Sequence, residues 1–378
     1  MISLPELLRK LKELGGSDLH LTTGSPPQVR IDGRLRPLDL PSMNAAETKR
    51  LAYSVLTDAQ KHRLEENLEL DFSFGVKDVS RFRGNIFYQR GAIAAVFRLI
   101  PFEIKSFEAL GLPPILASLC EKPRGLILVT GPTGSGKSTT LATMIDKINR
   151  ERHDHIVTLE DPIEFLHPHR NCIVNQREIQ SDTHSFTNAL RVLLRQDPDV
   201  VLIGEMRDLE TIESALRVAE TGHLTLATLH TNTAVSTINR IIDVFPAHQQ
   251  QQIRTQLSMV LEGVCCQTLL PKLGGVGRTV ALEVMIPNSA IRNLIREDKV
   301  HQIYGSMQAG QEKHGMQTFN QALATLYLNK QISLETAMSK SPNPVELEDL
   351  IKRGVGVVAS AGTGQMARPR PQPPTGRS

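Results

Sequence analysis

Residues Gly131 to Thr140 read GPTGSGKSTT and match the pattern G-x-x-x-x-G-K-[ST]. Glycines in this pattern let backbone N–H groups close around the β- and γ-phosphates of a nucleotide, and the helix that follows adds a favourable field. We expect Lys137 to neutralise phosphate oxygens and Ser138 to hold Mg²⁺. The predicted nucleotide-binding residues are those of the loop: Gly131, Pro132, Thr133, Gly134, Ser135, Gly136, Lys137, Ser138 and Thr139.

Two acidic segments follow apolar runs. In DPDVVLIGEMRD, residues 200–203 predict a buried strand that ends at Gly204 and Glu205. A carboxylate at a strand end beside a phosphate loop can orient and deprotonate an attacking water. The commoner pattern has Asp where Gly204 stands, so we expect Mg²⁺ to depend more on Ser138 and on water. TLEDPIEF supplies a second carboxylate, Glu160, at another strand end, and the residues leave a functional and a purely local role equally open.

Histidines and arginines are further candidates. His223 and His230 lie seven residues apart in TGHLTLATLH, so in a regular strand they point to opposite faces and are not expected to share a metal. They are either ordinary core or surface histidines, or sensors of a γ-phosphate or subunit interface. Arg81 and Arg83 share one strand face, and Arg98 follows nearby. These arginines form either a solvated sheet face or a clamp for a nucleotide held by another domain or subunit.

Secondary-structure patterns place these residues in an α/β fold. The run RGLILVTGPTGSGKSTTLATMIDKINR joins strand, glycine loop and amphipathic helix without a break, which is the context that a true phosphate loop requires. The segments HIVTLED, DVVLIGE and LTLATLH predict further buried strands that alternate with helices. This alternation predicts a parallel sheet with helices on both faces.

The first hundred residues predict a separate α+β domain. It has a helix over 4–14, a hairpin at Asp32-Gly33, two helices that open with capping boxes at Asn44 and Thr57, and three antiparallel strands that end before Pro101. We therefore predict an N-terminal domain (1–101), a connector with one helix (102–122), an ATPase core (123–288), a helical region (289–354) and a disordered tail (355–378) rich in Gly, Pro and small residues.

Composition narrows the classes of protein. The chain has 378 residues, 40% apolar and 22% charged, and no apolar run approaches the length of a membrane span. Its amphipathic start is not expected to be a signal peptide. The net charge of +3 equals the three arginines of the tail, so the formally neutral remainder argues against nucleic-acid binding.

The four cysteines show neither metal spacing nor a disulfide framework, which fits a reducing cytoplasm. We interpret the adjacent pair Cys265 and Cys266 as two small apolar residues in a helix.

The motifs resemble, in the family's order, those of the secretion-type ATPase superfamily. GPTGSGKST is similar to its phosphate loop, TLEDPIEF to its acidic box, LRQDPDVVLIGEMRDLETIESAL to its atypical second Walker motif, and AETGHLTLATLHTNTA to its histidine box. The resemblance extends from GGSDLHL to about Lys352. It implies a PAS-like N-terminal domain, a RecA-like motor domain, a homohexameric ring, and ATP with Mg²⁺ held between the domains.

The resemblance also implies roles for individual residues. Glu205 corresponds to the catalytic carboxylate and Glu160 to an accessory acid, while His223 and His230 correspond to sensors. Arg83 and Arg98 are the candidate clamps, and the choice among these two and Arg81 stays open.

Within the family, AIRNLIRED at 290–298 resembles the C-terminal signature of the type IV pilus retraction branch. In a helix, Ile291, Leu294 and Ile295 form an apolar stripe and the charged residues project elsewhere. The sequence also lacks the four-cysteine zinc element usual in pilus-assembly and type II secretion relatives. The resemblance thus implies a motor for pilus retraction and twitching motility, attached peripherally to the cytoplasmic face of the inner membrane through a pilus platform protein. A paralogous retraction ATPase is a further candidate partner.

Three alternatives are open at this point. The chain could be a sister motor for pilus assembly or type II secretion, a DNA-translocating RecA-like enzyme, or a non-catalytic accessory subunit. The missing cysteine element argues against a sister motor. The formally neutral body argues against a DNA translocase, and the complete set of catalytic motifs argues against a non-catalytic subunit.

Overall fold

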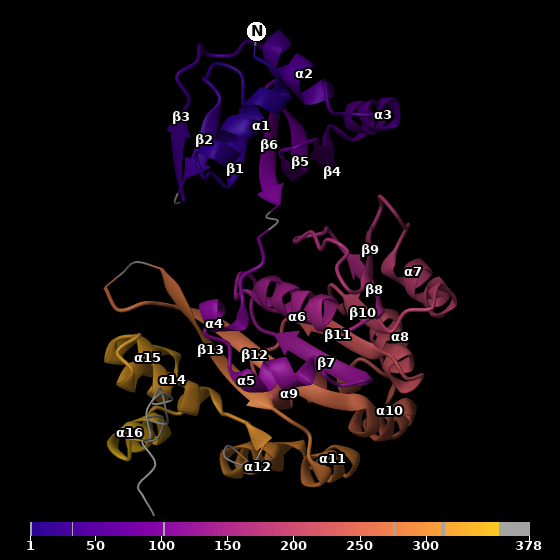
Figure 1. Cartoon of the computed structure of the whole chain (residues 1–378), viewed down its shortest axis with the longest axis vertical. Helices are drawn as coiled ribbons and strands as arrows, with labels where there is room; N and C mark the ends of the chain where they lie inside the picture. Colours follow the sequence, from indigo (N-terminus) through magenta and orange to yellow (C-terminus); the bar gives the residue numbers. More distant parts are fainter. Residues whose placement is uncertain (1, 32, 101–102, 275–276, 311–313, 355–378) are drawn as a thin grey trace, which may run out of the picture.

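The computed structural model describes residues 2–31, 33–100, 103–274, 277–310 and 314–354. An antiparallel sheet with its helices lies at the top of Figure 1, and a larger α/β body with a helical C-terminal region lies below it. Three sequence predictions concern residues outside the described ranges: the turn residue Asp32, the boundary at Pro101 and the tail 355–378.

The N-terminal sheet is antiparallel throughout and has the order β3-β2-β1-β6-β5-β4. Its strands are β1 (Asp18–Leu21), β2 (Gln28–Ile31), β3 (Arg34–Pro37), β4 (Glu69–Val76), β5 (Ser80–Gln89) and β6 (Ala92–Ile100). The β2–β3 hairpin and the consecutive strands β4 to β6 confirm the sequence prediction. In β5, Phe82 and Ile86 are fully buried, so the alternate residues Arg81 and Arg83 lie on the opposite face.

Three helices cover this sheet: α1 (Leu4–Glu13), α2 (Ala45–Tyr53) and α3 (Asp58–Asn67). The predicted capping boxes are present. The side chains of Asn44 and Thr57 each accept a bond from the third helical N–H, and their own backbone N–H groups donate the reciprocal bonds to the side chains of Glu47 and Gln60. Leucines at helical spacing along α1 enter the domain core, which confirms its amphipathic character.

Between the two sheets the chain forms two short helices, α4 (Phe107–Leu110) and α5 (Pro114–Leu119), where the sequence pattern predicted one. Gly111 has φ 69°, and Pro113 and Pro114 follow it. Since a left-handed glycine ends a helix and proline disfavours helical geometry in the residue before it, one continuous helix cannot form here.

The larger sheet has the order β13-β12-β7-β11-β10-β8-β9. Its strands are β7 (Gly125–Thr130), β8 (His155–Glu160), β9 (Ile173–Glu178), β10 (Val200–Ile203), β11 (Leu224–Leu229), β12 (Leu261–Pro271) and β13 (Arg278–Met285). All neighbours are parallel except β12 and β13. The predicted parallel α/β sheet is thus confirmed, with one antiparallel edge strand added.

Helices pack on both faces of this sheet, as the βα alternation predicted. On one face α6 (Lys137–Glu151) and α5 share a core with the strands. The other face is covered by α7 (Phe186–Leu193), which continues into a 3₁₀ turn η1 (Leu194–Gln196), and by α8 (Leu209–Glu220), α9 (Ala234–Asp243) and α10 (Ala247–Val260).

The helical prediction for Cys265 and Cys266 is wrong, because both lie in β12. This strand runs between β7 and β13, and the two thiols enter the cores on opposite faces of the sheet. A strand buried on both faces reads as a continuous apolar run, which periodicity alone does not separate from a buried helix.

The chain ends in helices, as predicted: α11 (Ser289–Arg296), the 3₁₀ turn η2 (Val300–Gln302), α12 (Ile303–Ala309), α14 (Phe319–Leu328), α15 (Leu334–Lys340) and α16 (Pro344–Lys352). Leu323 of α14, Ala337 of α15 and Leu347 of α16 form a small core against Leu270 and Ala281 of the β12–β13 pair. In the described part of the chain, no helix is both long and apolar enough to cross a bilayer.

Candidate active site

A cavity of about 720 Å³ opens at the carboxyl edge of the parallel strands. Ligands of open α/β sheets bind at this edge, because the loops that follow neighbouring strands converge there. The cavity is lined by the phosphate loop, by the ends of β8, β10 and β11, and by one strand of the N-terminal domain. The candidate residues that reach it from outside the loop are Glu160, Glu205, His230 and Arg83.

The phosphate loop joins β7 to α6 in the predicted way. Six of its residues line the cavity: Thr133, Gly134, Gly136, Lys137, Ser138 and Thr139. Gly131, Pro132 and Ser135 do not line it. Gly131, Gly134 and Gly136 have φ values of 138°, 77° and 89°, where a side chain would be strained.

Lys137 begins α6 and folds back over the loop. Its Nζ donates to the carbonyl oxygens of Gly131 at 2.8 Å and Pro132 at 3.1 Å. Burial lowers the pKa of Lys137, and the nearby carboxylates Glu205 and Glu164 oppose that shift. The ammonium group therefore lies beside two carbonyl groups of the loop, and Lys137 lines the cavity.

Gln267, which sequence reasoning missed, supports the loop from β12. Its side chain is buried, with Nε2 donating to the Ser135 carbonyl at 2.6 Å and Oε1 accepting from Thr140 Oγ1 at 2.9 Å. A Cβ atom at Gly131 would lie 2.2 Å from the Gln267 carbonyl oxygen, so this position requires glycine. The sequence offered one signal for Gln267, a polar amide within the apolar run VCCQTLL. Its partners could not be inferred, because they lie more than 120 residues away.

We expect Gln267→Leu to weaken nucleotide binding about 10- to 100-fold. The substitution leaves the Ser135 carbonyl and the Thr140 hydroxyl without their partner, so the loop is no longer held in one conformation and must be ordered when the nucleotide binds. The dissociation constant for a fluorescent ATP analogue measures the effect. Gln317→Leu is the matched control, since the Gln317 amide donates to the Leu282 carbonyl away from the cavity. An unchanged dissociation constant in folded Gln267→Leu protein would contradict the role given to Gln267.

Glu205 follows β10 and is held by two cationic or protonatable groups. Its Oε2 lies 2.7 Å from Arg207 Nη2, and its Oε1 lies 3.0 Å from His230 Nε2. Burial alone would raise the pKa of Glu205, but Arg207 and His230 more than offset this and hold it below its ordinary value. Glu205 is therefore ionised at neutral pH and able to accept a proton.

Gly204, the departure from the commoner Asp, has a steric reason. A Cβ atom there would lie 3.1 Å from the Leu159 carbonyl oxygen and 3.3 Å from Glu160 Cα. The Gly204 N–H donates to that same carbonyl at 2.7 Å, and its own carbonyl accepts from Thr228 Oγ1 at 2.5 Å. A side chain at this position would therefore require the backbone at the end of β8 to move by a few tenths of an ångström.

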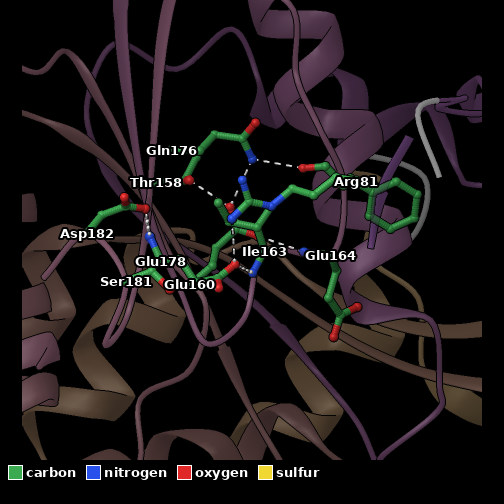
Figure 2. A network of polar contacts seen from close by, with 10 residues as sticks. Arg81, Thr158, Glu160, Ile163, Glu164, Gln176, Glu178, Ser181 and Asp182 are labelled. Atoms are coloured by element: carbon green, nitrogen blue, oxygen red, sulfur yellow. Dashed lines mark hydrogen bonds and ion pairs between the residues drawn. The ribbon is translucent and has the colours of Figure 1, made fainter. Parts of the chain in front are cut away.

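Glu160 ends β8 and is almost fully buried. Its Oε1 accepts from Thr158 Oγ1 at 2.6 Å and from Gln176 Nε2 at 3.1 Å (Figure 2). Burial raises the pKa of Glu160, and these hydrogen bonds limit the rise. The two candidate carboxylates thus have pKa values shifted in opposite directions, a combination that occurs where acid and base roles are divided.

The three arginines of the N-terminal sheet have different surroundings. Arg83 lines the cavity, and its nearest acidic partner, Asp71, lies 3.9 Å away. Arg98 does not reach the cavity, because its Nε is bound to Asp18 at 2.7 Å within its own domain. Within one chain, Arg83 therefore lines the cavity and Arg98 does not, and the role of Arg98 as a clamp stays a prediction.

His223 also lies away from the cavity. It precedes β11, at the amino edge of the sheet, and its Nδ1 lies 3.1 Å from the Val218 carbonyl oxygen and 3.1 Å from Thr221 Oγ1. His230 follows the same strand at the carboxyl edge. The two histidines are thus separated by the length of β11, so that His230 lines the cavity and His223 does not; the sensor role of each stays a prediction.

Two cavity-lining arginines were absent from the predicted set. Arg207 stands two residues after Glu205, and this short separation in the sequence could have identified it as a candidate. Arg278, at the start of β13, reaches the cavity from a distant strand and carries no local signal. Together with Lys137 and Arg83, they give the cavity four cationic side chains able to contact phosphate oxygens, beside four carboxylates in the same lining: Glu160, Asp161, Glu164 and Glu205.

Comparison with known proteins agrees with this geometry. The family model described as type II/IV secretion system protein matches residues 3–340. The type IV pilus retraction ATPase PilT of Pseudomonas aeruginosa is 50% identical over 343 residues, which cover 91% of this chain and 99% of the relative. A twitching motility protein of Neisseria gonorrhoeae is 49% identical over 317 residues, or 84% of each chain.

A solved structure shows the same arrangement. The crystal structure of the pilus retraction motor PilT with bound ADP matches with a TM-score of 0.87 and 55% sequence identity, covering 92% of this chain and 100% of that one. The chain belongs to the type II/IV secretion system protein family and is an ATPase of its pilus retraction branch.

Proposed function

We propose that this chain works as an Mg²⁺-ATP-hydrolysing homohexameric motor that powers type IV pilus retraction. One observation carries the proposal: the cavity at the sheet edge gathers the phosphate loop, two carboxylates, a histidine and an arginine from the other domain. An arginine contributed by a separate domain is what a motor needs if hydrolysis is to change the domain arrangement. The similarity to PilT supports the direction of the work, which is retraction.

Hydrolysis requires phosphate binding, activation of water and charge stabilisation. The loop N–H groups and Lys137 hold the β- and γ-phosphates. Glu205 takes the proton of the attacking water, because its depressed pKa keeps it ionised at neutral pH. His230, 3.0 Å from Glu205, orients this carboxylate and detects the γ-phosphate beside it.

The residues present fit a magnesium ion. The Ser138 hydroxyl and the carboxylates of Glu160 and Glu205 line one cavity, and oxygen donors are the ligands that Mg²⁺ prefers. Among the described residues, no group of three His, Cys, Asp or Glu side chains is arranged to hold a metal. Ser138, nucleotide phosphates and water would therefore supply the ligands. When bound, the ion neutralises charge on the phosphoryl group during transfer.

Arg83 serves as the clamp that couples the nucleotide to domain movement. It lines the cavity from β5, and its ion pair with Asp71 is long and largely exposed to solvent. Such an exposed pair contributes little, so Arg83 is available to phosphate oxygens. We propose that residues 1–101 and 123–288 move as two bodies. The first closes onto the second while ATP is bound, and hydrolysis allows them to separate again.

The assembly partners follow from the relationship to PilT. Six copies form the ring, and a pilus platform protein in the inner membrane receives the motion at its cytoplasmic face. A paralogous retraction ATPase is a second candidate partner. Nucleic acid is not proposed as a partner. The net charge of +3 equals the three arginines of the tail, so the rest of the chain is formally neutral and lacks the positive charge typical of nucleic-acid-binding proteins.

Two arginines of α11 have different surroundings: Arg292 contacts neighbouring elements of the fold, and Arg296 is exposed and available to a partner. Arg292 donates to the Ser258 and Met259 carbonyls at 2.7 and 3.0 Å, at the end of α10, and to Glu262 at 2.8 Å. Arg292 is thus a packing residue. Arg296, by contrast, is exposed and donates to Asn293 at 3.3 Å within the same helix.

We expect Arg296→Ala to leave ATP turnover near normal and to impair pilus retraction. Removing an exposed side chain away from the cavity changes stability little. Steady-state ATPase assays and imaging of labelled pili measure the two activities separately. A proportional loss of both would instead indicate a defect in folding or ring assembly, for which Arg292→Ala is the positive control.

Imaging of fluorescent pili on living cells tests the proposed function directly. Cells that lack this chain should carry pili that extend but no longer shorten. Bald cells would assign the chain to pilus assembly, and cells with normal pilus dynamics would refute a role in pili altogether.

A further inference from the structure

A buried carboxylate connects the N-terminal domain to the motor domain. Glu178 ends β9, and its side chain is 4% exposed. It accepts hydrogen bonds from the Ile163 N–H at 3.3 Å and from Ser181 Oγ at 3.2 Å, both within the motor domain. Its third partner is Arg81 of β5, whose Nη2 lies 3.2 Å from Glu178 Oε2 (Figure 2). The pair joins residues 97 positions apart in the chain.

The same strand face carries the proposed clamp. Arg81 and Arg83 alternate with Phe82, which is fully buried in the N-terminal core, so both arginines project from the sheet face opposite that core. Arg83 lines the nucleotide cavity and also a second cavity of about 520 Å³, whose walls come from the N-terminal domain and from the 161–162 and 178–181 segments. The contact that Arg81 makes with the motor domain therefore lies two residues from Arg83, on the same face of β5.

The carboxylate is also tied to the acidic segment of the active site. Gln176 and Glu178 stand two residues apart on β9. Gln176 donates to Glu160 at 3.1 Å, and Glu178 accepts from the backbone of Ile163, three residues after Glu160 (Figure 2). An arginine docked on Glu178 thus docks on the element that positions the buried acid of the site.

The ion pairs of the other two arginines differ in kind. Arg98 is bound to Asp18 inside its own domain, and Arg83 has a long contact with Asp71 in β4. Among the arginine ion pairs of the described N-terminal sheet, the pair made by Arg81 is the one whose acidic partner belongs to the motor domain. That partner, Glu178, is buried. Electrostatic attraction is strongest at such a site, and loss of one partner leaves the other charge buried and unpaired.

We propose that Arg81 is a positioning residue that docks on Glu178 and thereby places Arg83 over the nucleotide phosphates. Arg81 itself does not touch the nucleotide. This inference rests on the proposed use of Arg83 as the clamp, and the experiment below separates the two.

The test is a double-mutant cycle on ATP hydrolysis by the full chain. Arg81→Ala should lower kcat/KM about 10- to 100-fold, the scale expected when a catalytic group is misplaced by about 1 Å. Arg81→Ala combined with Arg83→Ala should be no slower than Arg83→Ala alone, because a positioning residue has no effect once the residue it positions is gone. Arg81→Lys should recover part of the rate, since it keeps the charge but not the planar guanidinium.

Controls separate positioning from folding. Glu178→Gln retains an acceptor for Ile163 and Ser181 but removes the charge, so it should reproduce the Arg81→Ala rate. Its melting temperature should fall less than that of Arg81→Ala, because the side chain left without its partner is the 27% exposed Arg81 and not the 4% exposed Glu178. Arg36→Ala, on the exposed strand β3, should behave as the unmodified protein.

The outcomes are distinguishable. If Arg83→Ala hydrolyses ATP normally, the clamp fails and the inference fails with it. If Arg83→Ala is slow but Arg81→Ala is normal, or if the two losses multiply in the double variant, the clamp stands and the positioning role of Arg81 is refuted.

Discussion

Lys137→Ala is expected to abolish motor function. The lysine ammonium sits at the mouth of the phosphate loop, within hydrogen-bonding distance of the Gly131 and Pro132 carbonyls. Its loss removes the cation that neutralises the β- and γ-phosphates, both in the bound state and in the transition state. Removal of one preorganised electrostatic donor lowers kcat by about 10²–10³-fold, and the weaker binding of ATP adds to this loss.

Lys147→Ala is the matched control for that experiment. Lys147 lies on the same helix α6, outside the cavity, and pairs with Glu151 one turn further on. ATP turnover and nucleotide affinity should be unchanged in this variant. Near-normal turnover in Lys137→Ala would show that the loop is not the phosphate site.

Glu205→Gln should bind ATP and hydrolyse it about 10²–10⁴-fold more slowly, the scale of losing a general base. The amide has nearly the same shape as the carboxylate but cannot accept the proton of the attacking water. It also cannot form the ion pair with Arg207 that holds the pKa of Glu205 low. Single-turnover hydrolysis and equilibrium binding of ATP measure the two effects separately.

Glu213→Gln provides the comparison, because Glu213 is exposed on α8 and pairs with Arg217 of the same helix. This variant should hydrolyse ATP at the normal rate. A Glu205→Gln protein that loses binding and hydrolysis in equal proportion would assign Glu205 to nucleotide binding or to folding, and the base would have to be sought at Glu160.

Much of the fold could be predicted because its signals are local. The capping boxes at Asn44 and Thr57, the β2–β3 hairpin and the strand–loop–helix unit at Lys137 each depend on backbone conformation within one short segment. The strand that carries Cys265 and Cys266 was misassigned, because its burial on both faces depends on neighbours that come from distant parts of the chain.

In the candidate site, too, residues with a local sequence signal could be predicted and residues without one could not. Glu205, Glu160 and His230 were recognisable because each ends or follows a buried strand, and parallel strands bring their carboxyl ends to one edge. The support from Gln267 was not recognisable, since Ser135 lies 132 residues earlier and no local pattern links them.

The sequence by itself determines a nucleotide-binding α/β core, because the phosphate loop and the strands that carry the candidate carboxylates are each encoded in contiguous residues. Its function as a motor follows from the resemblance of the whole motif set to a known family. The folded arrangement selects among chemically identical side chains. Arg98 is committed to Asp18, 80 residues away, and Arg81 to Glu178, 97 residues away, whereas Arg83 is left facing the nucleotide cavity. Three arginines of one sheet have three different surroundings because an ion pair depends on distance in space. Folding of the N-terminal sheet brings Arg98 to Asp18, whereas packing of the two domains brings Arg81 to Glu178 and Arg83 to the cavity.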